Sequence, residues 1–313
     1  MKVGVARSAL VMLGILLATA SCRRQEKKTP PPPPPRNELA PLVAPAAAAP
    51  LAVPGFGDAV LSAPAGVTTP APVLVAVLGI GDTPESQCAV WRELVGSRAF
   101  VLCPRGLPHF VPQDPSPVEP PEGTTSADQS ADTAGSEPQA DAGKVVQVGF
   151  YPSDVASVER EVAAGLGALR ARYGGYVAGG PVVYSGFSRG AFLGASVAAN
   201  APATFARAVL IEGGQSPWTD ETAAAFAKSG GKRILFACGR PSCVTESEQA
   251  AAILAKHQVE TRIVNGEGEG HGYKKQVKDQ LRASFDWVTE GDPPWRQLIA
   301  ASGPAPASAH AGQ

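Results

Sequence analysis

Short apolar runs alternate with longer segments of helical periodicity through most of the chain. The apolar runs predict buried strands at residues 73–78, 100–102, 182–184, 207–211, 233–237 and 260–264, with a short edge piece at 145–148. Between them, apolar positions three and four residues apart predict helices at 153–173, 189–200, 220–228 and 246–257, and a final helix that aligns Val277, Leu281, Phe285 and Val288. Such alternation implies an α/β fold class: a mainly parallel sheet with helices on both faces.

The N-terminus has the layout of an export signal. Lys2 and Arg7 precede an apolar stretch that is too short to span a bilayer comfortably, so residues 1–21 are expected to be a signal peptide. The segment Thr19-Ala20-Ser21-Cys22 resembles the lipobox of bacterial lipoproteins, in which the cysteine is lipidated after cleavage. This resemblance implies an exported protein, anchored to the bacterial membrane through Cys22 and facing the periplasm or the cell surface. The alternative is an ordinary secretory signal in which Cys22 has no role.

Three further segments are expected to be disordered. Residues 22–70 are rich in Pro and Ala and read as a tether, while residues 301–313 read as a tail. Residues 113–143 carry seven acidic residues and no Lys or Arg, which indicates an acidic insertion within a single domain over residues 71–300.

Charge excludes one class of partner. The chain has 27 Lys and Arg against 28 Asp and Glu, so no basic field is available to hold a polyanion such as a nucleic acid. The sequence suggests no metal and no organic cofactor, and it carries no signal for the oligomeric state.

Four cysteines remain when Cys22 is set aside, an even number that suits an oxidising compartment. Of the three possible pairings, the expected one joins neighbours in sequence: Cys88 with Cys103, and Cys238 with Cys243. A zinc site is the rival interpretation, but the spacings lack the paired C-x2-C form.

The candidate nucleophile is Ser188, in the motif Gly186-Phe187-Ser188-Arg189-Gly190. The motif follows a predicted strand and opens a predicted helix, as a nucleophile elbow requires. There the hydroxyl would lie at a helix N-terminus, where free amides favour negative charge. The alternative is a helix-capping serine in a glycine-rich turn.

The candidate base is His271, one of four histidines. It lies between glycines, after the last predicted strand and before the last helix, in a place unsuited to core packing. A serine hydroxyl needs such a base to accept its proton. The other interpretation is a plain loop histidine.

Strand, GFSRG, helix and a later loop with GHG before a final helix resemble the α/β-hydrolase superfamily, in particular compact esterases of the carboxylesterase and dienelactone hydrolase kind. The resemblance implies an oxyanion hole built from two backbone amides. One would be that of Arg189. The other would come from Gly79-Ile80-Gly81-Asp82, with Gly81 as the chosen donor.

The triad acid is the open point, because the usual aspartate after residues 233–237 is replaced by Cys238-Gly239-Arg240. Glu212 closes the strand 207–211, and Glu246 is the carboxylate nearest to the usual position. Glu212 is preferred because it ends a strand, whereas a first-turn glutamate such as Glu246 also suits the helix dipole.

These residues together predict a serine hydrolase that acts on a small-molecule carboxylic ester with a Ser-Glu-His triad. Only residues 213–219 separate the strand from the next helix, so no large cap is expected and the site would be open. Trp218 and Phe187 either line an acyl pocket or pack in the interior. The alternatives are an inactive hydrolase-like envelope lipoprotein that acts as a binding module or as a structural protein, and a serine peptidase on the same fold.

Overall fold

The computed structural model describes residues 39–45, 47–112, 145–273 and 275–295. The expected signal peptide with Cys22, the acidic insertion 113–143 and the tail 301–313 lie outside these ranges. Within the described ranges, the helices are too short or too polar for any of them to cross a membrane.

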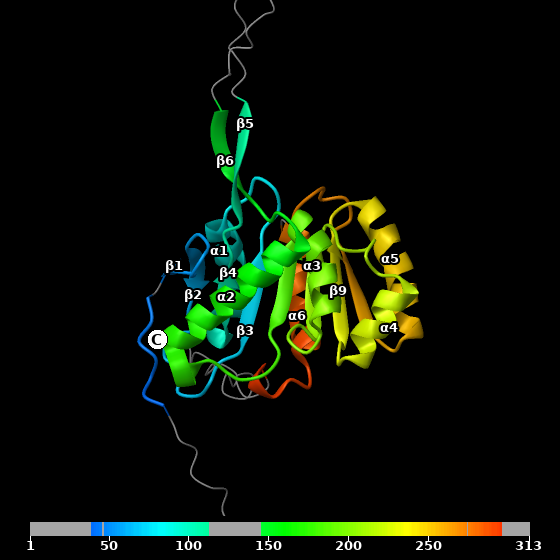
Figure 1. The fold of residues 1–313 in the computed structure, drawn as a ribbon. Coiled ribbons are helices and arrows are strands. Elements are labelled where there is room, and N and C mark those ends of the chain that lie inside the picture. Colours follow the sequence, from blue (N-terminus) through cyan, green and yellow to red (C-terminus); the bar gives the residue numbers. More distant parts are fainter. Residues whose placement is uncertain (1–38, 46, 113–144, 274, 296–313) are drawn as a thin grey trace, which may run out of the picture. The chain divides into compact units, whose positions relative to one another are not determined.

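A mixed, mostly parallel sheet of eight strands forms the centre of the described fold, in the order β1-β2-β4-β3-β7-β8-β9-β10 (Figure 1). Within this sheet β2 is antiparallel to both of its neighbours, and all the other strands run in one direction. The strands are β1 Ala49–Leu51, β2 Ala59–Ser62, β3 Val73–Val77, β4 Phe100–Cys103, β7 Val183–Phe187, β8 Arg207–Ile211, β9 Arg233–Cys238 and β10 Glu260–Asn265.

Helices cover both faces of the sheet. Side chains of β3 alternate between two apolar clusters: Val73, Val75 and Val77 belong to one, and Leu74 and Ala76 to the other. The first cluster includes residues of α2 Val155–Tyr173, α3 Arg189–Asn200, α4 Asp220–Lys228 and α5 Pro241–Lys256, and the second includes residues of α1 Pro84–Val95 and α6 Lys275–Thr289. Burial on both sides explains why the central strands read as unbroken apolar runs.

A separate two-stranded ribbon pairs β5 Leu107–Pro112 with β6 Val145–Tyr151 (Figure 1). Its base is joined to the loop after β3, where Phe150 and Asp82 form an antiparallel bridge. The ribbon therefore lies beside the carboxyl end of β3.

The expected α/β class is confirmed, and only residues 212–219 lie between β8 and α4, so no cap is inserted there. Several expectations were wrong. The range predicted for the disordered tether, residues 22–70, was too long, because β1 and β2 form between residues 49 and 62 and join the sheet. The edge piece 145–148 belongs to the ribbon instead of the sheet. Helix α5 begins at Pro241, five residues before the expected start, since proline suits the first helical turn.

Helix α1 was missed, although Thr83 caps its first turn and Pro84 follows in the first helical position. The charged and polar residues of its exposed side obscure the apolar stripe formed by Cys88, Trp91, Leu94 and Val95.

Two disulfides have the expected pairing: Cys88 with Cys103, and Cys238 with Cys243. The first joins α1 to β4, and the second joins the end of β9 to the first turn of α5. Their separations are 15 and 5 residues, for which loop-closure entropy gives about 3 and about 2 kcal/mol of stabilisation.

Candidate active site

Ser188 lies on a sharp turn between β7 and α3. Its φ of 51° is left-handed, a conformation that costs a residue other than glycine about 1–3 kcal/mol unless the surroundings hold it. Its amide donates to the Ile211 carbonyl at 2.8 Å, which ties the turn to the neighbouring strand.

The two glycines of the motif are required by close packing. A Cβ on Gly190 would lie 2.5 Å from the carbonyl oxygens of Val77 and Leu78, and one on Gly186 would overlap the Gly190 carbonyl. Helix α3 can therefore begin directly against β3 only because both positions lack a side chain.

His271 reaches Ser188 from the loop between β10 and α6. Its Nε2 lies 2.9 Å from the Ser188 Oγ, and 42% of its side chain is exposed. The Phe187 ring packs against the imidazole, with 5.2 Å between the ring centroids. Phe187 thus contacts the histidine and is not among the residues that line the adjoining cavity.

Glu212 follows the last residue of β8 and holds the other side of the imidazole. Its φ is 56°, its amide donates to the Ala237 carbonyl at 2.9 Å, and its side chain is fully buried. The His271 Nδ1 lies 3.2 Å from the Glu212 Oε2. Serine, histidine and glutamate therefore form one continuous chain of polar contacts.

The Glu212 carboxylate has three further donors. Oε1 accepts from the amides of Gly239 and Arg240, the latter at 3.1 Å, and Oε2 accepts from the Arg240 Nε at 2.6 Å. These contacts compensate a buried carboxylate for its lost hydration.

Glu246 takes no part in this chain. It is exposed on α5 and lines the cavity in front of Ser188, but no hydrogen bond or ion pair of its side chain occurs among the described residues. The structure thus brings Glu212, the preferred candidate, to the imidazole and leaves the alternative in solvent.

The two expected oxyanion amides differ. Arg189 is the first residue of α3, where an N–H has no acceptor within the helix. The Gly81 N–H, in contrast, donates to the Phe150 carbonyl at 2.9 Å, so the choice of Gly81 was wrong: β6 occupies that donor.

The Ile80 N–H, one residue earlier, has no acceptor in the described part of the chain and is the better candidate. The loop is close enough, because a Cβ on Gly79 would lie 3.1 Å from the Ser188 Cβ. The sequence contained no signal that favours Ile80 over Gly81, because the Gly81 amide is occupied by β6, which is distant in the sequence.

A cavity of about 360 Å³ opens in front of Ser188. Its lining combines charged, polar and apolar groups: Ser188, Arg189, Phe192, Glu212, Gly213, Gly214, Gln215, Ser216, Arg240, Cys243, Glu246 and His271. The Arg189 guanidinium is held by the Pro152 carbonyl, which accepts from Nε at 2.7 Å. A larger cavity of about 600 Å³ is lined by residues of α2 and the end of α3 and contains none of these groups.

Exposed apolar side chains surround this end of the sheet. Phe192 in the cavity wall and Ile80 in the loop after β3 are 49% and 55% exposed, and the ribbon adds Leu107, Phe110, Val145, Val146 and Val148. Trp218 is not part of this surface, because it is buried against Phe226.

The remaining described histidines lie elsewhere: His109 packs on Tyr151, and His257 contacts Asp220. Within the described ranges, no cluster of three or more His, Cys, Asp or Glu is arranged to bind a metal ion.

Neither a protein-family model nor a curated protein matches this chain. Solved structures do. The Bacillus cereus carboxylesterase is 18% identical over 74% of this chain and 93% of its own, with a TM-score of 0.47. Est1E from Butyrivibrio proteoclasticus is 11% identical over 81% and 99%, with a TM-score of 0.47. Esterase PE8 is 16% identical over 76% and 99%, with a TM-score of 0.48.

At these identities the matches are likenesses of fold, and the activities in those names are those of the matched proteins. The order of the mainly parallel sheet, its two helical layers and the strand-to-helix turn at Ser188 are what this chain itself displays. The chain therefore has an α/β fold with a mainly parallel sheet between two helical layers.

Proposed function

We propose that the protein is a serine hydrolase that cleaves carboxylic esters. The observation that carries the proposal is the alignment of Ser188 Oγ, His271 and Glu212, with contacts of 2.9 and 3.2 Å on the two sides of one imidazole. A hydroxyl, a base and an orienting carboxylate in this order are the requirements of nucleophilic acyl transfer.

In the first half of the reaction, the Ser188 Oγ attacks the ester carbonyl while its proton passes to His271 Nε2. The amides of Arg189 and Ile80 stabilise the oxyanion, a contribution of about 3–4 kcal/mol per donor in comparable sites. The alcohol then leaves with the proton from Nε2. In the second half, water gives a proton to Nε2 and attacks the acyl group; the bond from the acyl carbon to the Ser188 Oγ then breaks, Oγ takes the proton back from Nε2, and the acid is released.

Glu212 acts through the histidine. Its Oε2 accepts from Nδ1, which keeps the Nε2 lone pair directed at the hydroxyl and stabilises the imidazolium that forms during attack. The four donors around its carboxylate hold it in one orientation.

The surroundings of Ser188 are open and of mixed polarity. No cap is inserted after β8, and the exposed side chains of Ile80 and Phe192 lie beside the turn. An open site favours small or extended esters over a substrate that needs full enclosure.

The test is labelling with a fluorophosphonate probe together with hydrolysis of short p-nitrophenyl esters, compared with peptide anilides. We expect the wild type to be labelled and to hydrolyse the esters, and Ser188→Ala to lose both properties. Unlabelled, folded wild type would support a binding module instead, and a preference for the anilides would indicate a peptidase.

We also propose that the protein is exported and anchored to the bacterial membrane through a lipid on Cys22. Two disulfides in the folded domain support an oxidising compartment. Cys22→Ala should move the protein from the membrane fraction to the soluble fraction of the host bacterium. A wild type already in the soluble fraction would contradict the anchor.

A further inference from the structure

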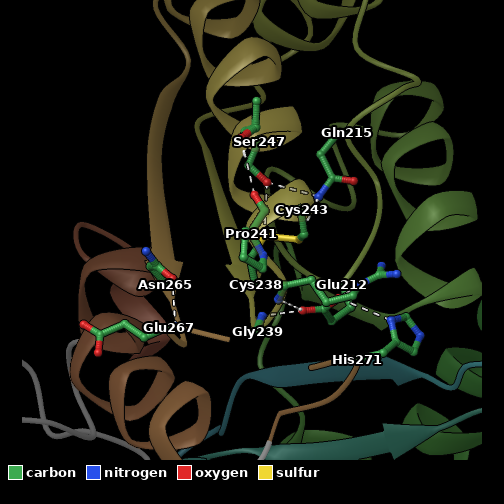
Figure 2. The surroundings of a disulfide bond; sticks show 12 residues. Glu212, Gln215, Cys238, Gly239, Pro241, Cys243, Ser247, Asn265, Glu267 and His271 are labelled. Carbon is green, nitrogen blue, oxygen red and sulfur yellow. Dashed lines mark hydrogen bonds and ion pairs between the residues drawn. A yellow bond between two sulfur atoms is a disulfide. The ribbon is translucent and has the colours of Figure 1, made fainter. Parts of the chain in front are cut away.

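The turn that follows β9 contacts two residues of the proposed triad. It comprises residues 238–243, is closed by the Cys238–Cys243 disulfide and lies next to Glu212 and His271 (Figure 2). We refer to it as the 238–243 turn. Although the turn stands where an acid was expected, it contains no carboxylate.

On one side, the turn supplies donors to the Glu212 carboxylate. The amides of Gly239 and Arg240 and the Arg240 Nε account for three of the four donors around it, and the fourth is His271 (Figure 2). Oε2 is shared between Arg240 and His271. A displacement of the turn would therefore displace the oxygen that orients the imidazole.

On another side, the turn supplies acceptors to the loop that carries His271. The Gly266 amide donates to the Cys238 carbonyl at 2.6 Å, and the Gly270 amide donates to the Gly239 carbonyl at 3.3 Å. A Cβ on Gly239 would overlap the Gly270 carbonyl, so the loop approaches the turn to a distance that only glycine permits.

The disulfide is buried at the centre of these contacts. Cys238 and Cys243 are both almost fully excluded from solvent. The Gln215 Nε2, from the loop after Glu212, lies 3.3 Å from the Cys243 Sγ and donates to the Ser247 Oγ at 3.1 Å (Figure 2). The sulfur bridge thus fixes the distance between the end of β9, which faces the His271 loop, and the start of α5, which faces the loop after Glu212.

We propose that the Cys238–Cys243 disulfide and Arg240 form a positioning element for catalysis, which holds Glu212 and His271 in register with Ser188. This inference rests on the proposed function. The disulfide stays intact during turnover and contacts no reacting atom, and its effect passes through the carboxylate and the imidazole.

The chain offers a matched control, because the Cys88–Cys103 disulfide closes a longer loop and touches none of the proposed catalytic residues. The test compares Cys238→Ala/Cys243→Ala with Cys88→Ala/Cys103→Ala for melting temperature, kcat and KM on a short p-nitrophenyl ester. Loop closure predicts that the control loses more stability. Positioning predicts the opposite order for turnover.

We expect kcat of the Cys238→Ala/Cys243→Ala variant to fall by about 10- to 100-fold with KM nearly unchanged, since a displacement near 1 Å costs up to about 10²-fold. The control should keep kcat within about threefold below its melting temperature. A kcat within threefold of wild type in the first variant would overturn the inference, as would equal losses of kcat in the two variants.

Arg240→Ala provides a second test that leaves the disulfide intact and decides the matter if the double variant does not fold. The Arg240 side chain is 46% exposed, but its removal takes one donor from the buried Glu212 carboxylate, so we expect a lower melting temperature and measure kcat at a temperature where the variant is folded. We expect kcat to fall by about 3- to 10-fold at constant KM, and Arg240→Lys to recover part of the loss. Wild-type kcat in Arg240→Ala would overturn its role. A wild type that neither turns over nor labels contradicts the proposed function itself.

Discussion

Replacement of Glu212 by glutamine changes one atom of the proposed triad and tests its least expected member. Both carboxylate oxygens are pure acceptors in the structure: Oε1 faces two backbone amides, and Oε2 faces Arg240 Nε and His271 Nδ1. A glutamine must turn its NH2 group toward one of these pairs. Whichever orientation the glutamine takes, its NH2 group, itself a donor, faces two other hydrogen-bond donors.

The favoured orientation keeps the oxygen on the backbone amides, because Arg240 is 46% exposed and can turn to water. His271 Nδ1 then lacks its acceptor, which favours the tautomer that protonates Nε2 and removes the base from Ser188. A buried donor without a partner costs about 1–3 kcal/mol, so we expect a comparable loss of unfolding free energy. Turnover should fall by about 10²- to 10⁴-fold.

The assay is kcat on a short p-nitrophenyl ester at a temperature where the variant is folded by circular dichroism, with the rate of fluorophosphonate labelling as a second readout. Glu246→Gln is the matched control, because it makes the same change in an exposed carboxylate of the same cavity. It should stay within about threefold of wild type. A folded Glu212→Gln variant with turnover like that of the control would refute the assignment of the acid.

Three other changes test the elbow and the interior. Gly190→Ala places a Cβ against two carbonyl oxygens of the β3 end, so we expect at least about 100-fold slower probe labelling or a failure to fold, read from labelling and melting curves. Burial raises the pKa of the Glu161 carboxyl above its usual value of 4.5, despite two backbone amides that donate to it. The folded state then keeps this proton to a higher pH than the unfolded state, so the contribution of the Glu161 proton to stability falls as pH rises from about 4.5 through the folded pKa. Glu161→Gln should remove that pH-dependent fall from the urea-denaturation midpoints. The buried pair of Arg207 and Asp292, 3.1 Å apart, predicts that Asp292→Asn lowers the unfolding free energy by about 3 kcal/mol, whereas a change below 1 kcal/mol would mean that water reaches the guanidinium.

The β5–β6 ribbon carries an exposed apolar surface and contacts the loop after β3. Its strands lie outside the main sheet, with neither face covered by a helix, and most of their apolar side chains are exposed. The same ribbon occupies the Gly81 amide through Phe150. The ribbon therefore decides which amide of the loop after β3 is free to bind an oxyanion.

The sequence by itself determined the local features. Apolar runs and helical periodicity depend on neighbouring residues, so the helices 189–200 and 220–228 and the strand 207–211 were predicted with the bounds observed. The motif around Ser188 was readable because its five residues are contiguous in sequence, although only Gly186 is required by a contact within the motif, whereas Gly190 is required by the end of β3. Neighbouring cysteines needed only short loops to pair as predicted.

The tertiary structure decided what depends on contacts between distant segments. The sequence favoured Glu212 over Glu246 as the end of a strand, and the tertiary structure brings the Glu212 carboxylate to His271. Strands β1 and β2 were hidden in a Pro- and Ala-rich segment because their stability comes from pairing and not from local preference: β2 pairs with β4, more than 30 residues away, and β1 pairs with β2. The free amide next to Ser188 was likewise set by a ribbon whose strands are separated by the insertion. Local preference acts over a few residues, whereas the assembly of a buried polar site requires that segments far apart in the chain meet at hydrogen-bonding distance.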